Sequence, residues 1–142
     1  MKDLTLTNDT KGIAFFGGQT AEDILCVNEF EDLGWEVQCS TNDGSLGVKG
    51  LITDAIDPWM EKQNISNLEF FVCGPGPMLH AIGDRATSND FTAWLSLDEN
   101  MACAVGACLT CVIKIKDGDG WKWARCCKEG PVFESREVLW NE

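Results

Sequence analysis

The sequence predicts an α/β fold in which a partial parallel sheet is followed by a small cysteine-rich domain at the C-terminal end. Short apolar runs that end in glycine alternate with helix-like segments across residues 13–85, a pattern typical of a parallel sheet. Five cysteines then fall within residues 103–127. We therefore expect two domains, residues 1–90 and residues 91–142.

Composition narrows the functional class. The 142 residues suffice for one ordinary domain, or one domain with a small appendage. Eleven basic residues stand against 23 acidic ones, and the net charge of −12 argues against nucleic acid or an anionic membrane as a partner. The sequence contains no apolar run of about 18 residues, so no membrane-spanning helix is predicted. The first residues also lack the features of a signal peptide, so we expect a cytoplasmic protein with reduced or metal-bound cysteines.

The first strand is expected at residues 13–16, an apolar run closed by two glycines. A helix should begin after Thr20, a potential N-cap. Apolar residues then recur at helical spacing, and Gly34 ends the helix. Residues 35–39 alternate in polarity and predict a second strand.

Further elements follow at similar intervals. A short helix is expected over residues 51–56, stopped before Pro58. Residues 70–73 predict another buried strand, and a helix should begin near Met78. Residues 86–99 are interpreted as a linker, with their apolar side chains covering the junction between the sheet and the cysteine-rich segment.

A hairpin is predicted near the C-terminal end. Residues 112–116 alternate as a strand, residues 117–120 form a turn, and residues 121–124 pair back. This hairpin should deliver Cys126 and Cys127 beside the earlier cysteines.

The cysteine pattern carries the chemistry. Cys103, Cys108 and Cys111 stand in a C-x4-C-x2-C arrangement, and a fourth thiol follows about fifteen residues later. This is the plant-type spacing by which four thiolates hold a [2Fe–2S] cluster. Small neighbours would let the backbone approach and point its amides at the cluster. These small residues are Ala102, Ala104, Gly106 and Ala107.

Other uses of the cysteines are possible in principle. Zinc also takes four cysteines, but structural zinc sites usually pair them on two separate knuckles. Disulfides would need an oxidising compartment. The fourth ligand is ambiguous, because Cys126 and Cys127 are adjacent and neighbours in an extended segment point to opposite faces.

Three strand ends could bind a nucleotide. In parallel sheets the ligand lies at the carboxyl ends of the strands, and a glycine-rich turn before a helix can cradle a phosphate. An acidic residue after the second strand could accept hydrogen bonds from the hydroxyl groups of a ribose. No Arg or Lys lies next to it in the sequence to bind a 2′-phosphate, which favours NAD over NADP. The candidate residues are Gly17, Gly18, Asp43, Cys73, Gly74 and Pro75.

Several segments together resemble one family. CGPGPM at residues 73–78, SLDENMAC at 96–103 and CKEGPVF at 127–133 resemble the electron-transfer subunit of NAD-dependent (class 1B) dihydroorotate dehydrogenase, in the ferredoxin–NADP reductase superfamily. The glycine-rich segments at 17–23 and 41–50 are also similar, and the resemblance extends over residues 12–135.

This resemblance implies a ferredoxin reductase-like fold and a place in pyrimidine biosynthesis. The family's C-x-D-G-P-V-F ending begins with the last cluster ligand, which implies Cys127 in this role. Glu129 replaces the usual Asp, and the hairpin has one extra residue, so Cys126 remains the second choice. The family's FAD-binding barrel and first glycine-rich strand are not found here, so we expect an N-terminally truncated chain whose FAD, if any, comes from a partner chain.

The function expected is one-electron relay through a [2Fe–2S] cluster, between flavin or nicotinamide and a partner oxidoreductase subunit in a hetero-oligomeric complex. No acid–base pair or activated nucleophile stands out, so the chain is not expected to be a complete catalyst. Two alternatives remain open. The chain could bind NAD(H) as a reductase half completed by a separate flavin chain, or its cysteines could hold zinc in an assembly module.

Overall fold

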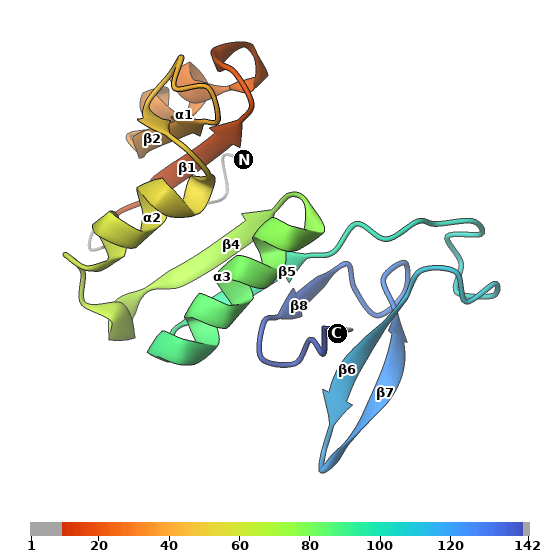
Figure 1. Cartoon of the computed structure of the whole chain (residues 1–142). Coiled ribbons are helices and arrows are strands. Elements are labelled where there is room, and N and C mark those ends of the chain that lie inside the picture. The colour runs from red at the N-terminus through yellow and green to blue at the C-terminus, as the bar shows by residue number, and fades with distance from the viewer. Residues whose placement is uncertain (1–9, 141–142) are drawn as a thin grey trace. The chain divides into compact units, whose positions relative to one another are not determined.

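A computed structural model describes residues 10–140 of the chain (Figure 1). Contacts between residues divide the chain into two compact units, the first ending at Gln63 and the second beginning at Asn64. The predicted α/β class is confirmed. The first unit contains β1 (Ile13–Gly18), the 3₁₀-helix η1 (Ala21–Asp23), α1 (Val27–Asp32), β2 (Glu36–Thr41), β3 (Val48–Lys49) and α2 (Ile52–Met60). The second contains the 3₁₀-helix η2 (Ile65–Asn67), β4 (Glu69–Cys73), α3 (Gly76–Asn89), β5 (Thr92–Ser96), β6 (Val112–Asp117), β7 (Gly120–Arg125) and β8 (Val132–Glu134).

The first unit is a three-stranded parallel sheet in the order β1-β2-β3. Its β1–β2 register runs from Ile13 opposite Glu36 to Gly18 opposite Thr41. Aromatic side chains fill the space beside the sheet. Phe16 meets Phe30 edge-on at 5.3 Å between ring centroids, and Phe30 meets Trp35 at 5.6 Å. Such contacts add to the free energy of apolar burial.

Two helices differ from their predicted bounds. The single helix expected between Thr20 and Gly34 is a 3₁₀ turn followed by the short α1, because Cys26 adopts a left-handed conformation (φ 63°) that interrupts a helix. The helix expected to stop before Pro58 instead continues to Met60. A proline removes one backbone donor without ending a helix whose apolar face is well buried, as Ala55, Ile56 and Met60 are here.

The second unit contains a three-stranded sheet in the order β4-β5-β8, in which β4 and β5 are parallel and β8 is antiparallel. The linker expected over residues 86–99 is therefore wrong. These residues end α3 and then form β5, whose central side chains Ala93 and Leu95 are fully buried. Alternation of buried and half-buried positions along Thr92–Ser96 is the ordinary pattern of a strand.

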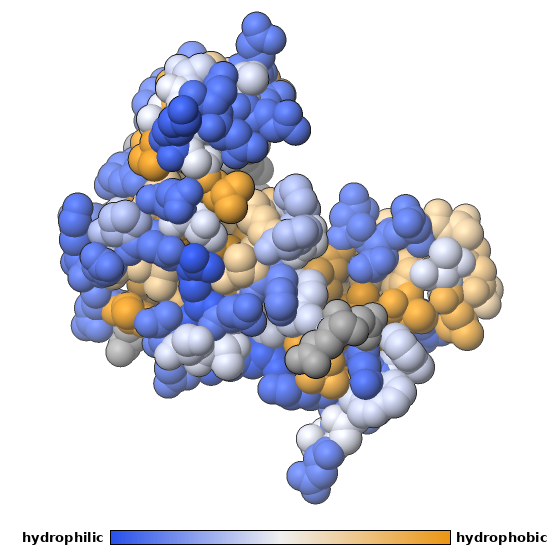
Figure 2. Space-filling model, viewed as in Figure 1, coloured by the Kyte–Doolittle hydropathy of each residue, from blue (hydrophilic) through white to orange (hydrophobic). Residues whose placement is uncertain are grey.

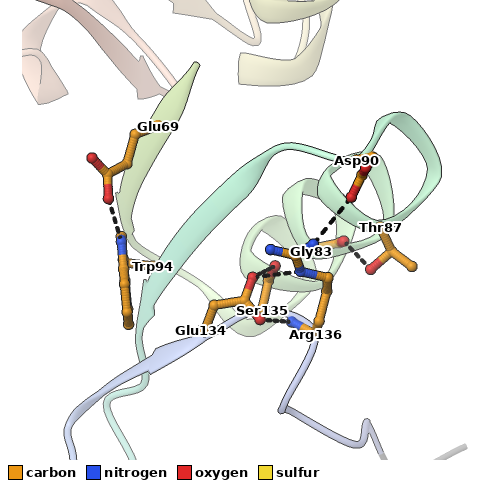
Figure 3. A network of polar contacts seen from close by, with 8 residues as sticks. All are labelled: Glu69, Gly83, Thr87, Asp90, Trp94, Glu134, Ser135 and Arg136. Atoms are coloured by element: carbon orange, nitrogen blue, oxygen red, sulfur yellow. Dashed lines mark hydrogen bonds and ion pairs between the residues drawn. The ribbon is translucent and has the colours of Figure 1, made fainter. Parts of the chain in front are cut away.

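A polar network ties the C-terminal segment to this sheet (Figure 3). Arg136 donates to the Glu134 carboxylate at 3.0 Å and to the Asp90 carboxylate at 3.1 Å. The Trp94 indole donates to Glu69 at 2.7 Å across the β4–β5 pair. The Arg136–Asp90 contact places this part of the C-terminal segment beside the C-terminal end of α3.

The predicted hairpin is confirmed as β6 and β7, paired in register from Val112 opposite Arg125 to Asp117 opposite Gly120. The C-terminal segment braces it, because the Lys116 amide donates to the Glu137 carbonyl and the Leu139 amide to the Lys114 carbonyl. The hairpin is therefore joined to the same C-terminal segment that joins the β4-β5-β8 sheet.

The division into units does not coincide with the predicted domains, residues 1–90 and 91–142. The boundary between the units lies between residues 63 and 64. Because β8 pairs with β5, residues 69–96 belong to the same unit as the cysteine-rich segment. The predicted domain boundary after residue 90 stays a prediction.

We predict that Leu95→Ala lowers the free energy of unfolding by about 2–5 kcal/mol, because it removes a fully buried leucine from the centre of β5. Chemical denaturation followed by circular dichroism measures the change. The matched control is Leu25→Ala, where the side chain is 69% exposed and the effect should stay within about 0.5 kcal/mol. Equal effects of the two substitutions would contradict the assignment of β5 to the core.

Candidate metal centre

The loop between β5 and β6 carries three of the clustered cysteines, and it extends away from the β4-β5-β8 sheet (Figure 1). Its backbone turns sharply at three residues with positive φ: Ala104 (55°), Gly106 (78°) and Leu109 (59°). A left-handed conformation costs a non-glycine residue about 1–2 kcal/mol. Of the small residues expected here, Ala104 and Gly106 lie at these turns.

The curled loop directs hydrogen-bond donors at sulfur, as the sequence predicts. The backbone amides of Ala107 and Cys108 donate to Cys103 Sγ at 3.3 and 3.4 Å. The Thr110 hydroxyl lies 3.1 Å from Cys108 Sγ and donates to it. Sequence reasoning did not single out Thr110, although its position between two cysteines was a usable signal.

These contacts favour the thiolate form of two cysteines. Hydrogen bonds from backbone amides, that of Val105 first, lower the pKa of the Cys103 thiol. The Thr110 hydroxyl is the main cause that lowers the pKa of Cys108 to about 6. Since the thiolate is the metal-binding form of cysteine, both side chains are prepared to act as ligands.

The four thiols fall into two pairs. Cys103 and Cys108 each shift the pKa of the other, and Cys111 raises the pKa of Cys127. The hydrogen bond with Cys111 is the largest cause that raises the pKa of Cys127. A binuclear cluster takes two thiolates on each iron, so two thiol pairs in one loop–hairpin region fit a [2Fe–2S] group. Within residues 10–140, no three His, Cys, Asp or Glu side chains surround a single metal position.

The adjacent cysteines have different surroundings. Cys126 is 1% exposed, its amide donates to the Cys111 carbonyl at 2.9 Å, and burial raises its pKa to about 11. The Cys127 side chain is partly exposed and meets Cys111 instead. The structure thus turns one thiol into the core and the other toward the cysteine-rich loop, while the identity of the fourth ligand stays a prediction.

An ion pair supports the cysteine-rich loop from the hairpin side. The Arg125 guanidinium binds the Glu129 carboxylate, with Nε donating to Oε2 at 2.9 Å, and Nη1 donates to the Gly106 carbonyl at 3.1 Å. Arg125 is the main cause that lowers the pKa of Glu129 to about 2. The sequence offered only the four-residue spacing of this pair as a signal, and such spacings are common on any surface.

Three of the candidate nucleotide-binding residues lie at one edge of the first unit. Gly17 and Gly18 end β1, and Asp43 lies in the turn after the neighbouring β2. The Asp43 carboxylate accepts from the Ser45 amide and hydroxyl at 2.9 and 2.6 Å, and the hydroxyl is the main cause that lowers its pKa. Asp43 is therefore an exposed carboxylate already held within its own turn.

The other three candidates lie together in the second unit. Cys73 ends β4 with an exposed side chain, Gly74 follows with φ 156°, and Pro75 is the N-cap of α3. Side chains rarely adopt this φ, which favours glycine, and a Cβ here would also displace the flexible end of Met78. The structure brings the six residues together as two groups of three, one in each unit.

Comparisons with known proteins agree with this geometry. A family model described as the iron–sulfur cluster binding domain of dihydroorotate dehydrogenase B matches residues 98–139. The chain is 40% identical over 113 residues to the electron transfer subunit of dihydroorotate dehydrogenase B (NAD(+)) from Caldanaerobacter subterraneus, covering 80% of this chain and 44% of that protein. It is 37% identical over 127 residues to the same subunit from Desulforamulus reducens, covering 89% and 48%.

A solved structure shares the fold. A chain of an NADH-dependent reduced ferredoxin-NADP oxidoreductase, studied for flavin-based electron bifurcation, superposes with a TM-score of 0.71 at 26% identity. The match covers 92% of this chain and 45% of that one. The chain thus spans about half the length of the proteins that it matches. The predicted ferredoxin reductase-like fold is confirmed, and the predicted iron–sulfur cluster agrees with the family model that matches residues 98–139.

We predict that Cys127→Ala abolishes stable cluster binding, whereas Cys126→Ala keeps it, because the Cys127 thiol is partly exposed and the Cys126 thiol is buried in the core. Iron content and the visible spectrum after anaerobic purification measure the difference. Cys126→Ala also serves as the stability control, since it removes a buried thiol without touching the thiol pairs. The opposite pattern would make Cys126 the fourth ligand.

Proposed function

We propose that the chain belongs to the family of dihydroorotate dehydrogenase B electron-transfer subunits and relays single electrons through a [2Fe–2S] cluster. The ligands in this proposal are Cys103, Cys108, Cys111 and Cys127. The observation that carries it is the set of amide and hydroxyl hydrogen bonds directed at Cys103 Sγ and Cys108 Sγ, within the segment that the cluster-domain model matches.

The chain's own residues set the conditions for this work. When bound, the cluster accepts and returns one electron at a time. The Ala107 and Cys108 amides hold their hydrogens toward Cys103 Sγ, and the Thr110 hydroxyl holds its hydrogen toward Cys108 Sγ. Such donors offset negative charge on sulfur and therefore favour the reduced state.

A partner flavoprotein or oxidoreductase subunit is proposed to dock at the cysteine-rich loop. Apolar side chains are exposed along it: Met101 is 51% exposed, Val105 74% and Leu109 61%. Figure 2 shows this end of the second unit as apolar on the face in view. Exposed apolar groups beside a redox centre suit a protein interface, which also excludes water from the path of the electron.

The cellular location is proposed to be the cytoplasm. Eight cysteines without a visible disulfide framework suit a reducing compartment. Among residues 10–140, no helix has the length and apolar character that crossing a bilayer requires.

A second candidate function is NAD(H) binding, favoured by the gathering of Gly17, Gly18 and Asp43 at the carboxyl edge of β1 and β2. Isothermal titration of the purified chain with NADH tests it. A saturable isotherm that Asp43→Ala removes would support a reductase half completed by a flavin chain. If titration of the cluster-loaded chain with NADH releases no heat, NAD(H) binding is contradicted and electron relay is the function that remains.

We predict that anaerobically purified protein is brown, contains about two irons per chain, and gives a rhombic electron paramagnetic resonance signal after reduction with dithionite. Iron analysis and the spectrum are measured on the same sample. Cys108→Ala is the control and should lose both colour and signal. A colourless protein with stoichiometric zinc would contradict electron relay and favour an assembly module.

A further inference from the structure

Arg125 joins two parts of the metal centre that are distant in sequence. It is the last residue of β7, two residues before Cys127. Its Nη1 reaches back to the cysteine-rich loop and donates to the Gly106 carbonyl at 3.1 Å. That carbonyl belongs to the residue between Cys103 and Cys108 at which the loop turns with φ 78°. One side chain therefore spans from the strand that presents the fourth thiol to the turn that presents the first two.

Glu129 fixes the direction of this side chain. Its carboxylate accepts from Arg125 Nε at 2.9 Å, from Arg125 Nη2, and from the Arg125 backbone amide at 2.7 Å. A guanidinium bound on two nitrogens by one carboxylate has little rotational freedom left. Nη1 is thereby aimed at Gly106, and a lysine could not reproduce both contacts because it lacks the planar fork.

The charge of Arg125 also lies within electrostatic reach of the thiols. The guanidinium donates to the Gly106 carbonyl and lies against Gly106, between Cys103 and Cys108 in the chain. The Arg125 side chain is 29% exposed, so water screens this interaction only in part. A positive charge here opposes the negative charge that the cluster gains on reduction.

We propose that Arg125 is a positioning residue that fixes the turn at Gly106 and, through its charge, raises the reduction potential of the cluster. This inference rests on the cluster assignment proposed above. The Arg125 side chain has two roles: its hydrogen bond holds the loop, and its positive charge acts on the cluster.

Three variants separate the two roles. Arg125→Gln removes both, so the reduction potential falls and the cluster is lost to a chelator about tenfold faster. Arg125→Lys keeps the charge but not the fork, so the potential stays close to that of the unsubstituted protein while cluster loss is faster. Glu129→Gln removes the negative partner, so the potential rises and the cluster is again lost faster.

The matched control is Lys122→Gln. Lys122 lies on the same strand, is exposed, and pairs with Asp117 at the turn of the hairpin at 3.0 Å. Its removal changes the net charge as Arg125→Gln does, and should change neither the potential nor the rate of cluster loss. If Lys122→Gln and Arg125→Gln shift the reduction potential equally, the shift arises from the net charge of the protein and the proposal is overturned.

The measurements are a spectroelectrochemical titration, the rate of iron transfer to a chelator, and hydrogen exchange of residues 101–110 in the apoprotein. Hydrogen exchange requires no cluster, and Arg125→Gln should accelerate it in this loop. An unsubstituted protein that binds no iron would overturn the proposed function. A cluster-loaded protein whose potential, iron release and loop exchange are unchanged by Arg125→Gln and Glu129→Gln would overturn only this inference.

Discussion

The hydrogen bonds that reach the sulfur atoms of Cys103 and Cys108 are the constraint on which the metal centre depends. They exist only because the loop turns at three residues with positive φ, two of which are not glycine. A backbone bent in this way is strained, and the strain persists where surrounding contacts fix it. The contacts available here are amide-to-sulfur bonds inside the loop and the Arg125 contact from outside.

The remainder of the second unit positions the fourth thiol. Cys127 follows the end of the hairpin. The Cys126 amide donates to the Cys111 carbonyl, and this bond holds the two cysteine-bearing segments side by side. The C-terminal segment joins this hairpin to the β4-β5-β8 sheet through β8 and through backbone bonds to β6. The buried Cys126 then acts as an anchor, whereas the adjacent Cys127 reaches the other thiols.

The sequence predicted those features that depend on local pattern. The cysteine spacing, the small residues of the loop, and the alternation of β6 and β7 each follow from residues close together in the chain. β5 was missed because the segment 86–99 mixes a helix end with a short strand, and only burial against α3 and β8 distinguishes that strand from a linker. The role of Arg125 depends on its approach to Gly106, nineteen residues away, which no local pattern indicates. The Cys26 break in the first helix likewise arises from backbone conformation at a residue type that rarely takes it.

Mössbauer spectroscopy of the chain reconstituted with iron-57 tests the central claim most directly, because it reports the number and environment of the irons. The account predicts two coupled irons in all-sulfur tetrahedral sites, diamagnetic together when oxidised, and one ferric and one ferrous site of equal area after reduction by one electron. A single high-spin iron held by the four cysteines, or a chain that takes up no iron, would contradict it.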